Sequence, residues 1–368
     1  METILVVVSR LEQCGPMRQL YEIIRYVSQY KRIKVITLYP EQKRTLISDY
    51  MSLNIDIYCV GLTNKYMFAS NLNKLKKIAI IDQISLVYSY GMSANVYALE
   101  LCRSVAHCTT LRMNASVDMN LAYGVFKGLM GTLVDNYILR KMDYIVCCSK
   151  TLFDIYKEKV PLSKLLCITN GVNVERFFPL DREKAKEKLK IGYNAIILLV
   201  CGSIDDRKNT LNIIRAFNRV KDGKKRKLIL AGTGPLLDMC KKEANKDVVF
   251  LDFVDDVVSL YSAADIYISA SYSEGLPNSV LEAGAVGCPM ILSDIPQHRE
   301  IFGEGCKFVR FFSPSSVEQL TKEIQNFELL EESRNNISYY FRKNYSSKKM
   351  ASLYNNLFDR ILALERCP

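Results

Sequence analysis

The stretch that decides the fold lies late in the chain, where residues 272–289 read Tyr-Ser-Glu-Gly-Leu-Pro-Asn-Ser-Val-Leu-Glu-Ala-Gly-Ala-Val-Gly-Cys-Pro. A short β-branched run, Ile266–Ser269, precedes it and predicts a buried strand. Asn278 or Ser279 is expected to cap a helix that runs to about Val286, where Gly287 and then a proline end it. The pattern therefore predicts a strand, a tight loop and a helix in succession.

The start of this helix is the first candidate for chemistry. Its free backbone N–H groups and positive dipole end can bind a phosphate or diphosphate without any metal. Glu274 in the loop and Glu282 in the helix are poor phosphate ligands, but they suit the hydroxyl groups of a sugar or ribose. Taken singly, each glutamate also fits an ordinary surface position.

A second motif, residues 202–209, reads Gly-Ser-Ile-Asp-Asp-Arg-Lys-Asn directly after the predicted strand Ile196–Val200. Arg207 and Lys208 stand at the start of an expected helix, where cations oppose the helix dipole unless an anion compensates them. Two solvated side chains would be the plain explanation. Together with the 272–289 stretch, the motif favours a phosphate-bearing ligand.

The rhythm of the whole chain predicts an α/β protein. Short apolar runs alternate with longer amphipathic stretches, first over residues 1–90 and again after residue 190. The runs expected to be strands are Ile4–Val8, Ile33–Leu38, Ile55–Cys59, Lys76–Ile81, Leu86–Tyr88, Ile196–Val200, Lys227–Leu230, Val248–Leu251, Ile266–Ser269 and Met290–Leu292. We therefore expect two Rossmann-like domains, 1–170 and 171–344, with a last helix at about 345–368 that packs back on the first domain.

Several function classes lose support from the sequence. A nicotinamide dehydrogenase would need a third glycine where Leu237 stands in the best glycine cluster, and no P-loop occurs. The 12 cysteines form no Cys-x-x-Cys and only 2 histidines are available, so no metal cofactor is expected. The acidic N-terminus lacks a signal peptide and no apolar run is long enough to span a membrane, which predicts a cytoplasmic protein.

Charge is uneven along the chain. The formal net charge is +11, of which residues 1–180 carry +8 (22 basic minus 14 acidic) and residues 181–368 carry +3 (28 minus 25). The excess of positive charge predicts an anionic partner for the first half, either a membrane surface or a phosphate-bearing substrate. Nucleic acid is disfavoured because the sequence contains no nucleic-acid-binding motif. One cationic cluster is Lys65, Lys74, Lys76 and Lys77, flanked by Tyr66, Met67 and Phe68.

An apolar stripe in the first half allows two interpretations. The residues that recur at helical spacing are Phe126, Leu129, Met130, Leu133, Val134, Tyr137 and Ile138, with Lys127, Arg140 and Lys141 nearby. Such a stripe is typical of core packing. The alternative is an interfacial helix that rests on anionic lipid at the inner face of the plasma membrane.

The quoted residues resemble the E-x7-E signature of the family 4 retaining glycosyltransferases, which have the GT-B fold: two Rossmann-like domains whose parallel sheets face a central cleft. The resemblance includes the Asn170-Gly-Val-Asn173 linker and Ala231-Gly-x-Gly-Pro235, and extends more loosely to Gly15-Pro16-x-Arg18. The chain is similar to members that build bacterial cell-surface polysaccharides.

The resemblance implies a role for each matching residue. Glu274 would meet the transferred sugar and Glu282 the ribose, while Lys208, with Arg207, would neutralise the leaving diphosphate. The remaining donor contacts would come from Gly15, Phe253, Val254, Gly275, Leu276, Asn278 and Ser279. The implied donor is a nucleotide-sugar, UDP- rather than GDP-linked, and the acceptor a glycan or lipid-linked saccharide.

The sequence departs from the family pattern at three places. Ser203 stands where many members have an arginine, Tyr90 where many have a histidine, and Cys14-Gly15 where they have two glycines. The two other functions considered are a nucleotide-sugar epimerase on the same fold and an inactive nucleotide-sugar-binding scaffold subunit. For the acceptor, Arg112 and Asn114 are the candidates in the first half, with ordinary loop positions as the alternative.

Overall fold

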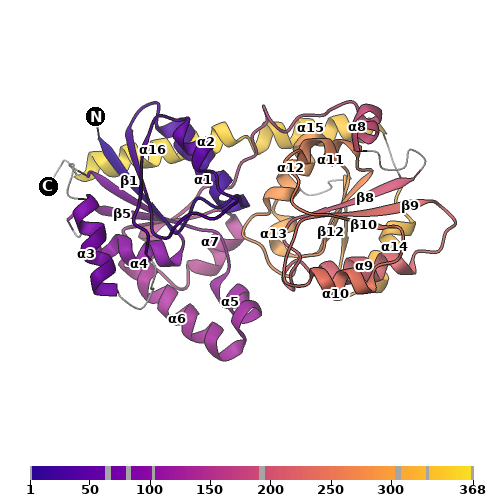
Figure 1. Ribbon diagram of the computed structural model, residues 1–368, viewed down its shortest axis with the longest axis horizontal. Coiled ribbons are helices and arrows are strands. Elements are labelled where there is room, and N and C mark those ends of the chain that lie inside the picture. Colours follow the sequence, from indigo (N-terminus) through magenta and orange to yellow (C-terminus); the bar gives the residue numbers. More distant parts are fainter. Residues whose placement is uncertain are drawn as a thin grey trace. The chain divides into compact units, whose positions relative to one another are not determined.

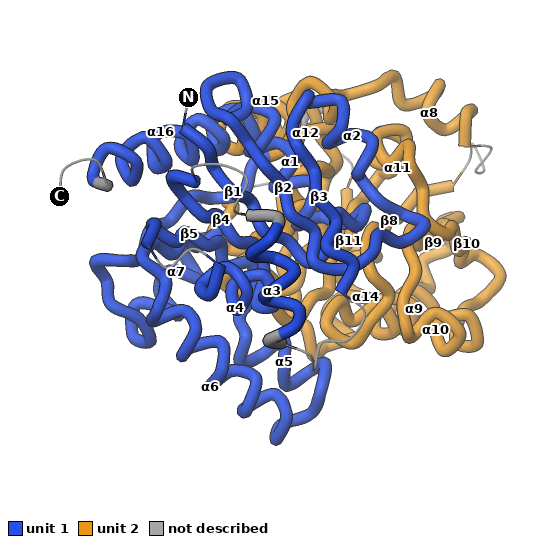
Figure 2. Tube along the Cα trace, turned by 60° about the vertical axis from the view of Figure 1, so that its left-hand side comes forward, with its two compact units in different colours: residues 1–171, 347–368 blue, residues 172–346 orange. Residues whose placement is uncertain are grey.

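The computed structural model describes residues 2–62, 68–79, 84–101, 104–189, 195–302, 308–328 and 331–365. The chain divides into two compact units: unit 1, residues 1–171 and 347–368, and unit 2, residues 172–346 (Figure 2). Each unit is an α/β domain with helices on both faces of a parallel sheet (Figure 1). This confirms the predicted fold class of two Rossmann-like domains.

Within the described residues, unit 1 contains a seven-stranded sheet in the order β3-β2-β1-β4-β5-β6-β7, and every pairing is parallel. The strands are β1 (Thr3–Val8), β2 (Arg32–Thr37), β3 (Asp56–Cys59), β4 (Leu86–Tyr90), β5 (Ala106–Leu111), β6 (Tyr144–Cys147) and β7 (Leu165–Cys167). The helices are α1 (Gly15–Val27), α2 (Ile47–Met51), α3 (Phe68–Ala79), α4 (Met92–Leu101), α5 (Ala115–Tyr123), α6 (Val125–Lys141), α7 (Lys150–Tyr156) and α16 (Ser347–Glu365).

Strand β1 shows why this sheet is covered on both faces. All six of its residues are buried, and successive side chains of a strand point to opposite faces. Ile4, Val6 and Val8 join a core cluster with α1 and α16, while Leu5 and Val7 join a second cluster with α4. The C-terminal helix thus lies beside α1 although more than 300 residues separate them (Figure 1).

Unit 2 repeats the plan with a six-stranded sheet among the described residues, in the order β10-β9-β8-β11-β12-β13. The strands are β8 (Ile196–Cys201), β9 (Arg226–Ala231), β10 (Val248–Leu251), β11 (Ile266–Ser269), β12 (Met290–Ser293) and β13 (Val309–Phe312). The helices are α8 (Arg182–Leu189), α9 (Thr210–Arg219), α10 (Leu237–Glu243), α11 (Val257–Ala263), α12 (Asn278–Val286), α13 (Pro296–Arg299), α14 (Val317–Gln325) and α15 (Glu331–Asn344).

Two sequence predictions in unit 1 are wrong. The run 76–81 was expected to be a strand, but residues 76–79 belong to helix α3, in which Asn71 and Leu75 are buried one turn apart and Lys76 and Lys77 are exposed. Residues 80 and 81 lie outside the described residues. The apolar stripe over 126–138 was expected in the core, yet only Ile138 of its seven residues is buried. Within the part of the chain that is described, no helix is both long enough and apolar enough to cross a membrane.

Candidate active site

The candidate site lies in unit 2 where the strand order changes direction. Strands β8 and β11 are neighbours in the sheet, although β9 and β10 stand between them in the sequence. Ligands of open parallel sheets bind beyond the carboxyl ends of the strands at such a switch point. The 205–209 loop after β8 and the 270–277 loop after β11 meet there, with Tyr272 N–H donating to the Arg207 carbonyl over 2.9 Å.

Glycines hold the neighbouring loop of β9 against the loop of β8. A Cβ atom added to Gly232 would lie 1.9 Å from the Gly202 carbonyl oxygen, and one added to Gly234 would lie 2.2 Å from the Ile204 carbonyl oxygen. Neither position can hold a larger residue without moving backbone. The glycine cluster that fails as a dinucleotide fingerprint therefore serves the close approach of two loops.

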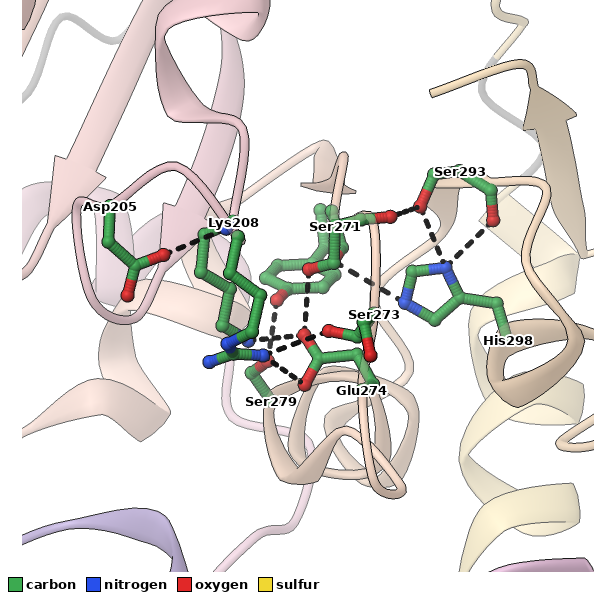
Figure 3. Close-up of polar contacts among 11 residues, drawn as sticks. Asp205, Lys208, Ser271, Ser273, Glu274, Ser279, Ser293 and His298 are labelled. Carbon is green, nitrogen blue, oxygen red and sulfur yellow. Dashed lines mark hydrogen bonds and ion pairs between the residues drawn. The ribbon is translucent and has the colours of Figure 1, made fainter. Parts of the chain in front are cut away.

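Glu274 is the centre of the site (Figure 3). Its side chain is almost fully buried, and its Oε1 accepts from Lys208 Nζ over 2.6 Å and from the Ser271 hydroxyl over 2.7 Å. Its Oε2 accepts from Arg207 Nη1 over 2.9 Å. Burial alone would raise the pKa of Glu274, but Lys208 and Arg207 outweigh it and lower that pKa to about 2. Glu274 is therefore an anion throughout the neutral range.

The two cations are held by their own loops. The backbone N–H of Lys208 donates to Asp205 Oδ1 over 2.8 Å, which closes the turn before α9. Asn209 follows in the left-handed region at φ 55°, and its amide donates to the carbonyls of Ala270 and Pro314. Arg207 Nη1 also donates to the Ser273 carbonyl over 3.0 Å. These contacts fix both side chains toward Glu274 before any ligand arrives.

Helix α12 begins at Asn278, one residue beyond the loop. The expected cap by Asn278 or Ser279 is wrong: the N-cap position is Pro277, which has no side-chain donor or acceptor, and the Ser279 hydroxyl accepts from the Tyr267 hydroxyl over 2.7 Å instead. The N-cap side chain therefore caps none of the first-turn N–H groups, which suits a helix start that binds an anion. Gly275 and Leu276, in the loop before it, are buried. Gly287 ends the helix in the left-handed region at φ 86°.

The remaining predicted residues lie around this centre or apart from it. Glu282 stands one turn into α12, half-buried, where the Tyr261 hydroxyl donates to its Oε2 over 3.1 Å. Phe253 and Val254 are half-buried just after the edge strand β10. Gly15 lies in unit 1, as the first residue of α1. Direct contacts therefore join Glu274, Lys208 and Arg207 within unit 2.

Sequence reasoning missed the polar support behind Glu274. His298, fully buried in α13, is linked through Nδ1 to the Ser293 carbonyl over 2.8 Å, and the Ser293 hydroxyl donates to the Ser271 carbonyl over 2.7 Å (Figure 3). Burial lowers the pKa of His298 to about 4, so its ring is neutral at pH 7. The available sequence signal is the run Ser-Asp-Ile-Pro-Gln-His-Arg-Glu at 293–300, which also resembles the family pattern but indicates no role for His298.

Unit 1 has its own switch point, between β1 and β4. Tyr90 ends β4 and donates its hydroxyl to the Pro16 carbonyl over 3.1 Å, next to the start of α1. Arg112 follows β5, with its guanidinium 4.8 Å from the centre of the Tyr90 ring and Nη1 donating to Asn170 Oδ1 over 2.7 Å. Its Nε and Nη2 are buried without a hydrogen-bond partner among the described residues. Asn114, in contrast, accepts only a local bond from Ser116 among the described side-chain contacts.

Comparison with known proteins finds glycosyltransferases. The family model Glycosyl transferases group 1 matches residues 181–344. The O-antigen biosynthesis glycosyltransferase WclY of Escherichia coli is 26% identical over 97% of this chain and 99% of its own length. A UDP-Gal:alpha-D-GlcNAc-diphosphoundecaprenol alpha-1,3-galactosyltransferase of Escherichia coli is 28% identical over 36% of this chain and 37% of its own length.

Solved structures show the same fold over the whole chain. Sucrose-phosphate synthase from Thermosynechococcus elongatus has a TM-score of 0.83 at 15% identity, covering 99% of this chain and 100% of its own. Anabaena HepE, solved with UDP and glucose, has a TM-score of 0.82 at 13% identity, covering 98% and 100%. The chain has the GT-B fold and is a glycosyltransferase, and its residues 181–344 match the group 1 family model.

Proposed function

We propose that the chain is a retaining, metal-independent hexosyltransferase. It would move a sugar from a nucleotide-sugar, UDP- rather than GDP-linked, to a glycan or lipid-linked saccharide during the synthesis of O-antigen, capsule or exopolysaccharide. The observation that carries the proposal is the contact of two cations with one buried carboxylate, Lys208 and Arg207 with Glu274, beside the start of α12.

The charges of this cluster suit the departure of a nucleoside diphosphate. Breaking the bond between the sugar carbon and the phosphate oxygen builds negative charge on the diphosphate, which fixed cations and helix N–H groups stabilise. A diphosphate at α12 would compete with Glu274 for Lys208 and Arg207. Glu274 would then be free to accept from the sugar hydroxyls, so the same contacts that hold the cations also position the sugar ligand.

Retention and the acceptor follow the same line of proposal. The acceptor oxygen would attack the sugar carbon on the face that the phosphate leaves, and its proton would pass to the departing phosphate oxygen. Two cations already stand where a divalent ion would otherwise balance the charge, which supports metal independence. UDP is supported by the titles of the similar HepE and galactosyltransferase.

We place the enzyme on the cytoplasmic side, in peripheral contact with the inner face of the plasma membrane. The excess of positive charge in residues 1–180 supports contact with anionic lipid, where a lipid-linked acceptor would be met. Unit 1 would bind the acceptor and unit 2 the donor, because the paired cations lie in unit 2. The remaining contacts to the donor would be made by Gly15, Val254, Gly275, Leu276, Asn278, Ser279 and Glu282.

The test is a panel of UDP-, GDP-, ADP- and CMP-sugars, offered with EDTA and with added Mg²⁺. Binding, slow hydrolysis and the anomeric configuration of the released sugar are followed by NMR. Wild type is compared with Lys208→Ala and Glu274→Ala. Lys322→Ala is the matched control, since Lys322 pairs with Glu318 over 2.8 Å on the exposed face of α14.

We expect one nucleotide-sugar to release its nucleoside diphosphate with retained configuration, equally well in EDTA, and only the control variant to keep this activity. Conversion to an epimeric nucleotide-sugar would favour the epimerase instead. Binding without turnover in any condition would favour the scaffold subunit. Failure to bind any nucleotide-sugar would overturn the donor site itself.

A further inference from the structure

The helix α6 of unit 1 exposes most of its large apolar residues. Its buried residues are Gly128, Thr132, Asp135, Ile138 and Leu139, so large apolar residues are buried only near its C-terminal end. Most of its large apolar residues face outward: Phe126 is 79% exposed, and the other exposed ones are Val125, Leu129, Met130, Leu133, Val134 and Tyr137. A surface helix of a globular protein has the opposite arrangement.

The inward face explains how α6 can pack in this way. A Cβ atom on Gly128 would lie 2.7 Å from the Asn120 Cα of α5, so the two helices approach to backbone contact. The Thr132 hydroxyl donates to the Gly128 carbonyl over 2.8 Å, which satisfies it within its own helix. The contact between the two helices is therefore close at Gly128 and Gly131, and of the large apolar residues of α6 only Ile138 and Leu139 are buried.

The exposed apolar surface is continuous along the chain from α5 into α6. Of the 22 large apolar side chains exposed among the described residues, 11 lie between Met113 and Tyr137. The others are spread over the rest of the described chain. Both views of the chain place α5 and α6 at an outer margin of unit 1 (Figures 1 and 2). Contiguous apolar patches on this scale mark interaction surfaces.

The charges on this surface select the partner. Between Met113 and Lys141 the exposed charged residues are Lys127, Arg140 and Lys141, all cationic. The two acidic residues of this segment point inward, since the Asp118 carboxylate oxygens and the Asp135 side chain are buried. Symmetric pairing with a second copy would bring like charges together, whereas an anionic lipid surface complements them.

The loop after α7 extends the cationic end of α6. Lys164 Nζ donates to the Arg140 carbonyl over 3.1 Å, and Arg140 Nε donates to the Lys159 carbonyl over 3.1 Å. Leu162, between them in the sequence, is 62% exposed. An apolar side chain framed by cations again fits the boundary between head groups and acyl chains.

We infer that the α5–α6 surface, with its apolar residues from Met113 to Tyr137, is a membrane-docking site that inserts into the head-group region of an anionic phospholipid bilayer. The inference rests on the proposed function, because it identifies the surface that would make the proposed membrane contact. Its lipid binding is independent of sugar transfer, because the cations and carboxylate of the donor site belong to unit 2.

An introduced tryptophan can report on lipid contact by its fluorescence, because the sequence contains no tryptophan of its own. Phe126→Trp places a single indole on the docking surface. Tyr339→Trp is the matched control at a side chain 67% exposed in unit 2. Each full-length variant is titrated with vesicles of phosphatidylcholine alone and with vesicles that contain phosphatidylglycerol. We expect a blue shift of the emission only for Phe126→Trp and only with the anionic vesicles.

A cosedimentation arm measures the strength of binding. Phe126→Asn with Leu133→Asn, and separately Lys127→Gln with Lys141→Gln, should each lower the fraction bound to anionic vesicles about tenfold or more, and raised salt should lower it too. Tyr339→Asn with Met239→Asn, exposed positions in unit 2, should bind as wild type does. Lys208→Ala should also bind as wild type, which separates failure of the docking site from failure of the donor site.

Three results would overturn the inference. The first is an unshifted emission of Phe126→Trp with anionic vesicles. The second is a lack of selectivity, either for anionic over neutral vesicles or for the docking-surface variants over the unit 2 control. The third is a dimer in sedimentation velocity, without lipid, that Phe126→Asn with Leu133→Asn converts to monomer, because a second copy of the chain would then be the occupant.

Discussion

The two sheets present the same switch-point topology with opposite chemistry. In unit 2 a buried carboxylate, Glu274, is saturated by Lys208, Arg207 and Ser271. In unit 1 the equivalent position between β1 and β4 holds Tyr90 and the guanidinium of Arg112, which has buried N–H groups without a partner among the described residues. One site is complete in itself and the other has unused donors. The comparison favours a fixed donor site in unit 2 and a ligand-completed site in unit 1.

The largest effect should come from removing the centre of the complete site. Glu274→Ala leaves two cations without their carboxylate, so we expect turnover of the nucleotide-sugar to fall by about 10² to 10³-fold. Initial rates of diphosphate release measure this loss. Glu274→Gln keeps the shape but not the charge, and activity above a tenth of wild type in that variant would contradict an electrostatic role.

A smaller and more selective effect is expected in unit 1. Arg112→Leu removes the guanidinium that lies over the Tyr90 ring. Transfer to the acceptor should therefore fall about tenfold, while hydrolysis of the donor is unchanged. The ratio of transfer to hydrolysis is the measurement. Equal loss of both reactions would show that Arg112 supports the fold of unit 1 rather than the acceptor.

The two units should also respond to acid in opposite directions. The pKa of Glu274 is lowered to about 2 from 4.5, so its contribution to stability is present above pH 4.5 and is lost as the pH falls toward 2. Burial raises the pKa of Asp135 in α6 to about 6 from 3.8, against the lowering effect of Lys159. The stability that depends on protonated Asp135 is therefore fully present below pH 3.8 and is lost as the pH rises through 6.

Asp135→Asn tests this contrast within unit 1. The free energy of unfolding at pH 7 should rise by roughly 2 kcal/mol, because a buried carboxylate no longer has to ionise. Chemical unfolding of the full chain at pH 4 and pH 7 checks it. A variant that is less stable than wild type at pH 7 would show that the charge of Asp135 is favourably paired, for instance with Lys159.

The smallest effect should come from the support of Glu274. Ser271→Ala removes one of three donors to this carboxylate, and the loss of one hydrogen bond to a charged group predicts about a tenfold lower rate or less. Ser273→Ala is the neighbouring control, because its hydroxyl has no partner among the described residues. A larger loss in Ser273→Ala than in Ser271→Ala would contradict the prediction that the Ser271 hydroxyl supports Glu274.

Much of unit 2 could be predicted from the sequence because its strands are short runs of apolar residues, many of them β-branched. Val248–Leu251 and Ile266–Ser269 agree with the structure at both ends. The contact of Arg207 and Lys208 with Glu274 could not be predicted, because it depends on β8 and β11 being neighbours in the sheet. The motif match grouped these residues by function, whereas the strand order brings them together in space.

The exposure of α6 in unit 1 could not be predicted, for a physical reason. Helical spacing of apolar residues tells which side chains share a face, but not whether that face is buried, so α6 was assigned to the core. Glycine and threonine at 128 and 132 carried the missing information, because small residues at i and i+4 allow a close helix contact that leaves the opposite face outward. The cationic cluster near residue 70 remains a prediction for Lys65, Tyr66 and Met67, which lie outside the described residues.

The return of α16 to unit 1 has a consequence for the order of synthesis. The chain leaves unit 1 after Gly171 and re-enters it at Ser347, and Val172 pairs with Ser346 where the two crossings meet. Tyr354, Phe358 and Ile361 of α16 belong to the core of unit 1. On the ribosome, all of unit 2 therefore emerges before unit 1 can close its core, and a chain stopped near residue 346 would hold a finished donor domain attached to an unfinished partner.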